Sequence, residues 1–62
     1  MILSIKAIRT NMGLTQQQMA DAMGVTYTRW VNIEMGRTPL KAKEFVKLHN
    51  ISGVPYDNIA ID

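Results

Sequence analysis

The sequence predicts an all-α fold, a compact domain of four to five short helices. Apolar residues recur at the three- and four-residue spacing of helix faces. Glycines follow these runs at intervals of about one short helix, and no internal repeat, low-complexity tract or linker divides the chain. Because 62 residues suffice for only one domain, we expect a single domain over residues 1–62, which buries about 60% of its unfolded surface.

The first two helices are delimited by glycine and by capping residues. We expect the first helix over residues 4–12, with Gly13 as its C-terminal cap. The second begins after Thr15, since Thr15 and Gln18 have the spacing of a capping box, and it ends before Gly24. The residues expected on the inner faces of these helices are Ile5, Ile8, Met12, Met19, Ala20 and Met23.

The third helix is predicted over residues 27–35. Thr26 precedes it as N-cap, and Val25 before the cap can pack on Trp30. Only three residues separate it from the second helix, and Gly24 among them permits a sharp change of direction. Two helices joined in this way form a helix-turn-helix.

A fourth helix is expected to start at Thr38 and Pro39, as N-cap and first-turn proline, and to end at Gly53. Residues 54–59 could form a last short helix. The residues expected in the buried stripe of the fourth helix are Ala42, Phe45, Val46 and Leu48.

Composition excludes several classes of function. There is no cysteine, hence no disulfide scaffold, thiolate zinc site or cysteine nucleophile. His49 is the single histidine and the carboxylates are scattered, so we expect no enzyme activity, no metal and no cofactor, with His49 half-buried on the fourth helix. No small-molecule ligand is indicated. No run approaches 18 apolar residues and the apolar start is too short for a signal peptide, so a cytoplasmic protein without membrane contact is expected.

Basic charge is concentrated in the first two thirds of the chain. Six of the seven basic residues but only two of the five acidic residues lie in residues 1–43. This asymmetry suits a polyanionic partner; an ordinary solvated surface is the alternative.

The third helix has an inner and an outer face. Trp30 and Ile33 fall on the inner side, although an exposed Trp30 that stacks on a base is an alternative. The outer side carries few charges and offers groups that can read a major groove, because amides match adenine, threonine and apolar groups match the thymine methyl, and arginine matches guanine. The candidate base-reading residues are Tyr27, Thr28, Arg29, Val31 and Asn32. Gln16, at the start of the second helix, lies among free backbone amides that can hold a phosphate.

The stretch LTQQQMADAMGVT at residues 14–26, followed by Trp30, Ile33-Glu34 and Gly36-Arg37, closely resembles the Cro and phage-repressor type of helix-turn-helix, the lambda-repressor-like DNA-binding domain. The resemblance covers roughly residues 5–59. It implies double-stranded DNA as partner, with docking of the third helix in the major groove.

The resemblance also implies roles for single residues. Tyr27, Thr28 and Asn32 match positions that meet base edges, and Gln16 matches one that contacts phosphate and braces the next side chain. Arg9 and Glu34 match a pair that forms a salt bridge. The residues expected at phosphates are Gln16, Gln17, Arg37, Thr38 and Lys41. Met35, where asparagine is common, and the large Tyr27 depart from the pattern.

We therefore expect a transcriptional regulator, a repressor of phage or prophage type, that binds a palindromic operator as a homodimer, at least on DNA. A protein-interaction module on the same fold is the alternative, with Tyr27, Val31 and Met35 as its contact patch. A fragment of a larger regulator is disfavoured, since the chain starts with Met1 and ends soon after the last helix. Residues 51–62, with Ile59 and Ile61, are the expected dimer surface.

Overall fold

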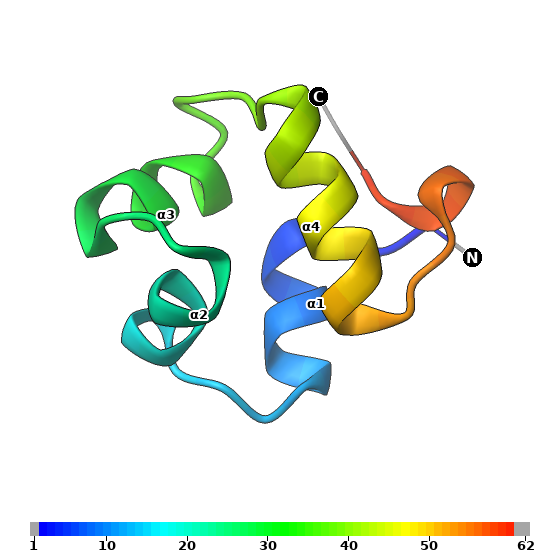
Figure 1. Ribbon diagram of the computed structural model, residues 1–62, viewed down its shortest axis with the longest axis horizontal. Coiled ribbons are helices and arrows are strands. Elements are labelled where there is room, and N and C mark those ends of the chain that lie inside the picture. Colours follow the sequence, from blue (N-terminus) through cyan, green and yellow to red (C-terminus); the bar gives the residue numbers. More distant parts are fainter. Residues whose placement is uncertain (1, 61–62) are drawn as a thin grey trace.

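The computed structural model describes residues 2–60, and it confirms the all-α class. Four α-helices and one 3-10 helix succeed one another in a body of 27 × 22 × 18 Å (Figure 1). The elements are α1 Ile5–Asn11, α2 Gln16–Met23, α3 Tyr27–Glu34, α4 Ala42–Ser52 and the 3-10 helix η1 Tyr56–Asn58.

The capping residues start α2 and α3 where the sequence predicts. The Thr15 hydroxyl accepts the Gln18 N–H at 3.1 Å, and the Gln18 side chain accepts the Thr15 N–H at 2.9 Å, which completes the capping box. At α3 the Thr26 hydroxyl accepts the Arg29 N–H at 3.1 Å. Between the helices Gly24 has φ +73°, a left-handed conformation that side chains other than glycine adopt at a cost.

The core is formed where α1, α2, α3 and α4 meet around Trp30, whose side chain is fully buried. Met19 and Met23 are buried as expected, while Met12 packs against the core from its edge. The predicted burial of Trp30 is therefore confirmed, and the alternative of an exposed Trp30 is wrong. The buried apolar residues are Ile8, Met19, Ala20, Met23, Trp30, Ile33, Leu48 and Ile59.

The end of the described chain returns to its beginning. Leu3 and Ile59 form a parallel β-bridge, in which the Leu3 N–H bonds to the Asn58 carbonyl at 2.6 Å and the Ala60 N–H to the Leu3 carbonyl at 2.9 Å. The expected last helix is thus a single 3-10 turn. Ile59 is buried and cannot serve the dimer surface expected there, and Ile61 lies outside the described residues.

The start of α4 differs from the prediction. The helix begins at Ala42 with Lys41 as N-cap, and the Glu44 side chain accepts the Lys41 N–H at this start. The backbone N–H groups of Arg37 and Thr38 are bound to the Asn32 carbonyl of α3. Residues 37–40 form a connection instead of a first helical turn.

The buried stripe of α4 is also rotated from the prediction. Glu44 and Leu48 face the core, Phe45 packs at its edge, and Ala42 and Val46 are exposed, Val46 by 45%. The physical reason is that the carboxylate of Glu44 has partners inside the fold, so a charged residue occupies the inner face. Among the described residues, none lies in a helix long and apolar enough to cross a membrane.

Candidate nucleic-acid interface

The outer face of α3 carries two polar side chains, Thr28 and Asn32, that make no bond within the described fold, while Tyr27 at its start bonds to Gln16. Tyr27 is 47% exposed and Thr28 is exposed, while Val31 and Asn32 are half-buried along the same face. Within residues 2–60 neither the Thr28 hydroxyl nor the Asn32 amide has a hydrogen-bond partner. Their polar groups can therefore bond to a partner without breaking a contact of the fold.

A carboxylate network fixes α3 on the side of α1 and α2. The Glu34 carboxylate accepts bonds from the Arg9 guanidinium, from the Trp30 indole N–H and from the Gln16 amide, the last at 3.3 Å. Only 4% of the Glu34 side chain is exposed, so these donors offset the cost of burying its charge. The structure contains the Arg9–Glu34 pair that the resemblance implies. The sequence did not reveal the bonds from Trp30 and Gln16.

This network extends to the outer face through Gln16. The Tyr27 hydroxyl donates to the Gln16 side-chain oxygen at 3.4 Å, while the nitrogen of the same amide donates to Glu34. Gln16 is therefore oriented from both ends and braces Tyr27, the first residue of α3. The backbone N–H groups at the start of α2 lie beside it without intrahelical acceptors.

The other phosphate candidates lie around this face. Gln17 is exposed, and its amide donates to Asp21 at 3.0 Å. Arg37 is exposed and Thr38 is half-buried in the connection that follows α3. Lys41 is exposed at the start of α4. The helices therefore place candidate phosphate contacts near both ends of the α3 face.

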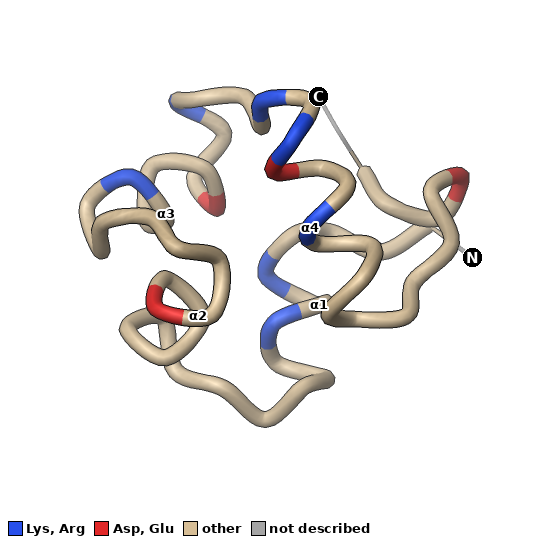
Figure 2. Tube along the Cα trace, viewed as in Figure 1, with Lys and Arg blue, Asp and Glu red and all other residues tan. Residues whose placement is uncertain are grey.

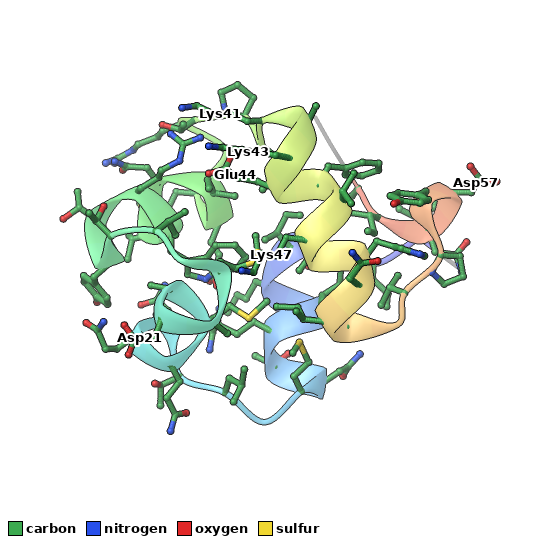
Figure 3. The ribbon with its side chains drawn as sticks, in the orientation of Figure 1. Asp21, Lys41, Lys43, Glu44, Lys47 and Asp57 are labelled. Carbon is green, nitrogen blue, oxygen red and sulfur yellow. The ribbon has the colours of Figure 1, made fainter. Side chains whose placement is uncertain are left out.

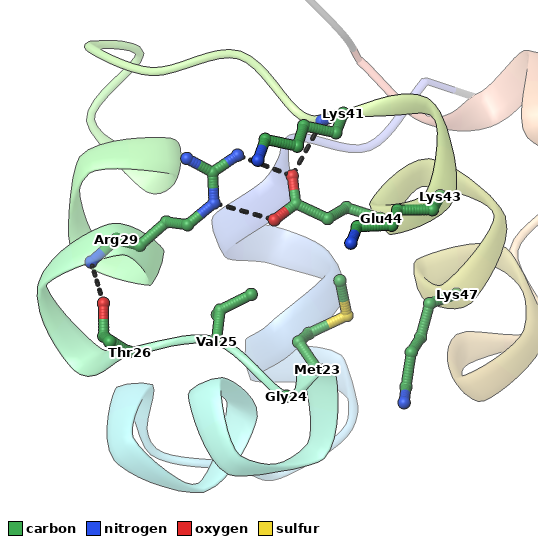
Figure 4. A pocket seen from close by; sticks show the side chains of 9 residues that line it. All are labelled: Met23, Gly24, Val25, Thr26, Arg29, Lys41, Lys43, Glu44 and Lys47. Carbon is green, nitrogen blue, oxygen red and sulfur yellow. Dashed lines mark hydrogen bonds and ion pairs between the residues drawn. The ribbon is translucent and has the colours of Figure 1, made fainter.

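Arg29 lies elsewhere than expected. Its guanidinium makes a bidentate pair with Glu44 on α4, with Nε–Oε2 and Nη2–Oε1 distances of 2.7 Å (Figure 4). The pair uses Nε and Nη2 and leaves Nη1 for other bonds. Arg29 therefore positions α3 against α4, and its contact with a base stays a prediction.

Glu44 is the residue that sequence reasoning missed at this site. It is 5% exposed, and besides Arg29 it accepts the Lys41 backbone N–H at 2.7 Å. The Arg29 hydrogen bonds lower the pKa of Glu44 to about 2, against the opposing effect of burial, and the same contact raises the pKa of Arg29. The available signal was an acid three residues after the N-cap of a helix, but it required the correct start of α4.

A groove of about 530 Å³ separates the α2–α3 turn from α4 (Figures 3 and 4). Basic positions are concentrated along the first part of α4 in Figure 2. Figure 4 identifies them as Lys41, Lys43 and Lys47, with Glu44 beside them. The residues that line the groove are Met23, Gly24, Val25, Thr26, Arg29, Lys41, Lys43, Glu44 and Lys47.

His49 is half-buried on α4, as expected. Its Nδ1 bonds to the Val54 carbonyl at 2.8 Å and its ring stacks on Tyr56 with centroids 3.9 Å apart. Among the described residues no group of three potential metal ligands gathers around it or elsewhere. The ring thus closes the end of α4 onto η1.

Comparison with known proteins assigns the arrangement to a family. A family model described as a helix-turn-helix domain matches residues 4–60. This chain belongs to the helix-turn-helix domain family. The kinship with the Cro and phage-repressor type, expected from residues 14–26, is thereby confirmed at the level of the family.

One relative gives the helix-turn-helix chain a closer comparison. The chain is 40% identical over 53 residues to a Bacillus subtilis (strain 168) protein named as the SPbeta prophage-derived uncharacterized HTH-type transcriptional regulator YonR. The matched part is 86% of this chain and 49% of the relative, so the chain spans about half the length of that relative. No solved structure gives a significant match.

Proposed function

We propose that this helix-turn-helix domain is a transcriptional regulator that binds double-stranded DNA sequence-specifically, with α3 in the major groove. The observation that carries the proposal is the division of α3 into a buried face and an outer face. Trp30 is fully buried behind the helix, while Thr28 and Asn32 present unpaired polar groups on its outer face. A major groove about 12 Å wide admits one such helix.

Each residue of the outer face has a role in the proposal. Asn32 bonds to the edge of an adenine, and Thr28 and Val31 contact thymine methyl groups. Tyr27, held by Gln16, packs beside the bases at the start of α3. The phosphates on the two sides of the groove are held by the start of α2 and by the connection after α3. The proposed phosphate contacts are Gln16, Gln17, Arg37, Thr38 and Lys41.

The name of the prophage-derived relative supports a regulator of phage type. We propose that the domain acts in the cytoplasm as a repressor, by occupying an operator, and that it does so as a homodimer on DNA. Two copies of α3 related by a two-fold axis would then read half-sites about one helical turn apart.

Selection of bound sequences from random duplexes, repeated at two salt concentrations, tests the proposal. The expected result is an inverted repeat whose half-sites lie roughly 10 base pairs apart, with affinity that falls steeply as salt rises. A protein-interaction module with Tyr27 and Met35 in its contact patch is the competing function, since Met35 is 56% exposed. No enrichment of any sequence, together with no retention of duplex at low salt, would refute DNA binding.

A further inference from the structure

A row of three lysines borders the groove on its α4 side. Lys41 is the N-cap of α4, and Lys43 and Lys47 lie one helical turn apart on the edge that faces the α2–α3 turn (Figure 4). All three are exposed, and within the described part of the chain none forms an ion pair. Glu44, the acid beside them, is already bound by Arg29. The groove therefore keeps a positive edge.

This lysine row is unfavourable for the isolated domain. Lys41 and Lys43 place positive charge at the helix N-terminus, where the macrodipole is also positive. Lys43 and Lys47 are like charges at i and i+4, a spacing at which they repel each other. Glu44 attracts Lys41 and offsets part of this cost, but no ion pair within the described residues engages Lys43 or Lys47. An anionic partner at these two lysines would make the row more favourable.

We propose that Lys43 and Lys47 form a further DNA-binding element, which contacts phosphates of the duplex that α3 reads. The inference rests on the proposed function and extends its surface onto α4. At 100° per residue Arg29 lies about 60° from Asn32 around α3, so the groove that Arg29 lines adjoins the reading face. The Arg29–Glu44 pair ties α4 to α3 and thereby fixes the lysine row relative to that face.

The spacing of the two lysines suits one DNA strand. Four residues rise about 6 Å along a helix, and successive phosphates of one strand advance about 3.4 Å along the duplex axis. The flexible four-carbon stem of each lysine spans the difference. Such contacts carry no base information, so they strengthen binding to all sequences alike.

Lys43→Gln and Lys47→Gln test this element, with Lys6→Gln as the matched control. Lys6 is exposed on α1 and does not line the groove, so all three variants lose the same net charge. Affinity is measured by fluorescence anisotropy over a series of salt concentrations. The probes are the selected duplex and a mixed-sequence duplex of 30 base pairs.

Each groove variant should lower the slope of log affinity against log salt by about 0.9. The ratio of the affinity of the unmodified protein to that of the variant then falls about threefold between 50 and 200 mM salt. Lys6→Gln should leave the slope unchanged. The groove variants should bind DNA more weakly but should be more stable than the unmodified protein. Their Tm should rise by about 1–4 °C because the repulsion between the lysines is relieved. Removal of a side chain with a merely structural role would not raise Tm and weaken DNA binding at the same time.

The other outcomes are distinguishable. An unchanged slope at Lys43 and Lys47, with normal binding by the unmodified protein, overturns this inference and leaves the proposed function standing. An equal slope change for Lys6→Gln also overturns it, because net charge alone would then be responsible. Absence of duplex binding by the unmodified protein overturns the proposed function itself. A polyglutamate peptide provides the last comparison. If its binding depends on the lysines while duplex binding does not, the groove binds a protein partner and the DNA contact is overturned.

Discussion

Acid should unfold this domain in part through one carboxyl group, that of Glu44. Its pKa is lowered from 4.5 to about 2 in the folded protein, chiefly by the hydrogen bonds from Arg29. A carboxylate whose folded pKa is depressed stabilises the fold fully above its unfolded pKa and ceases to do so below its folded pKa. The contribution of Glu44 should therefore be complete above about pH 4.5 and disappear as the pH falls toward 2.

The size of this contribution follows from the shift. Each unit of pKa corresponds to about 1.4 kcal/mol, so the shift from 4.5 to about 2 gives an upper bound of about 3.5 kcal/mol for Glu44. Glu44 is only 5% exposed, but 27% of the Arg29 side chain is open to solvent, so part of the interaction is screened. We expect a loss of about 1–3 kcal/mol from the free energy of unfolding. A 62-residue domain has a total of only roughly 3–9 kcal/mol.

Urea unfolding of the original protein and of Glu44→Gln, at steps from pH 7 to pH 2, measures this loss. Trp30 is the single tryptophan and is fully buried, so its fluorescence reports unfolding directly. The stability difference between the two proteins should be largest at pH 5–7 and should narrow below pH 4. Asp57→Asn, a change of an exposed carboxylate on η1, serves as control and should give a curve parallel to the original. A difference for Glu44→Gln that stays constant from pH 7 to pH 2 would refute the assignment.

Four further substitutions at three positions probe α3 and its surroundings. Asn32→Ala should cost about 1–3 kcal/mol of discrimination at one base pair and leave Tm nearly unchanged; an unaltered operator preference would show that the docking register is wrong. Arg37→Ala should weaken binding to all duplexes alike and reduce the salt slope by roughly one unit, whereas a change in sequence preference would contradict a phosphate contact. Trp30→Ala should cost about 3–5 kcal/mol and unfold most of the domain, as circular dichroism would show. Trp30→Phe removes the indole bond to Glu34 and part of the ring but keeps most of the packing, so it should cost less than Trp30→Ala, about 1–3 kcal/mol; equal losses for the two variants would contradict a role in packing.

The starts of α2 and α3 could be predicted because their signals are local. The capping bonds of Thr15 and Thr26 join residues three positions apart, and the left-handed turn between the helices requires only Gly24. The start of α4 could not be read in the same way. Thr38 and the following proline have the form of a helix start, but the Thr38 N–H is bound to the Asn32 carbonyl at 3.3 Å. The helix starts after Lys41 instead, where the Glu44 side chain accepts the Lys41 backbone N–H.

The outer face of α3 was likewise predictable from helical periodicity, while the direction of Arg29 was not. Arg29 lies at the flank of that face, where it can turn toward the DNA or toward α4. Its direction is set by Glu44, 15 residues further along, which the predicted register of α4 left outside the buried stripe. The predicted start of α4 thus also left the direction of Arg29 unpredicted.

The two acids explain how a helix as short as α3 can remain in place. Eight residues are too few for a stable isolated helix, so α3 depends on its attachments. Trp30 anchors it in the core, Glu34 ties its C-terminal end to α1 and α2, and Glu44 ties its N-terminal half to α4 through Arg29. Each attachment uses an inner or flanking position of the helix. Thr28 and Asn32 take part in none of these attachments. The residues proposed to read bases can therefore vary without loss of the fold that presents them.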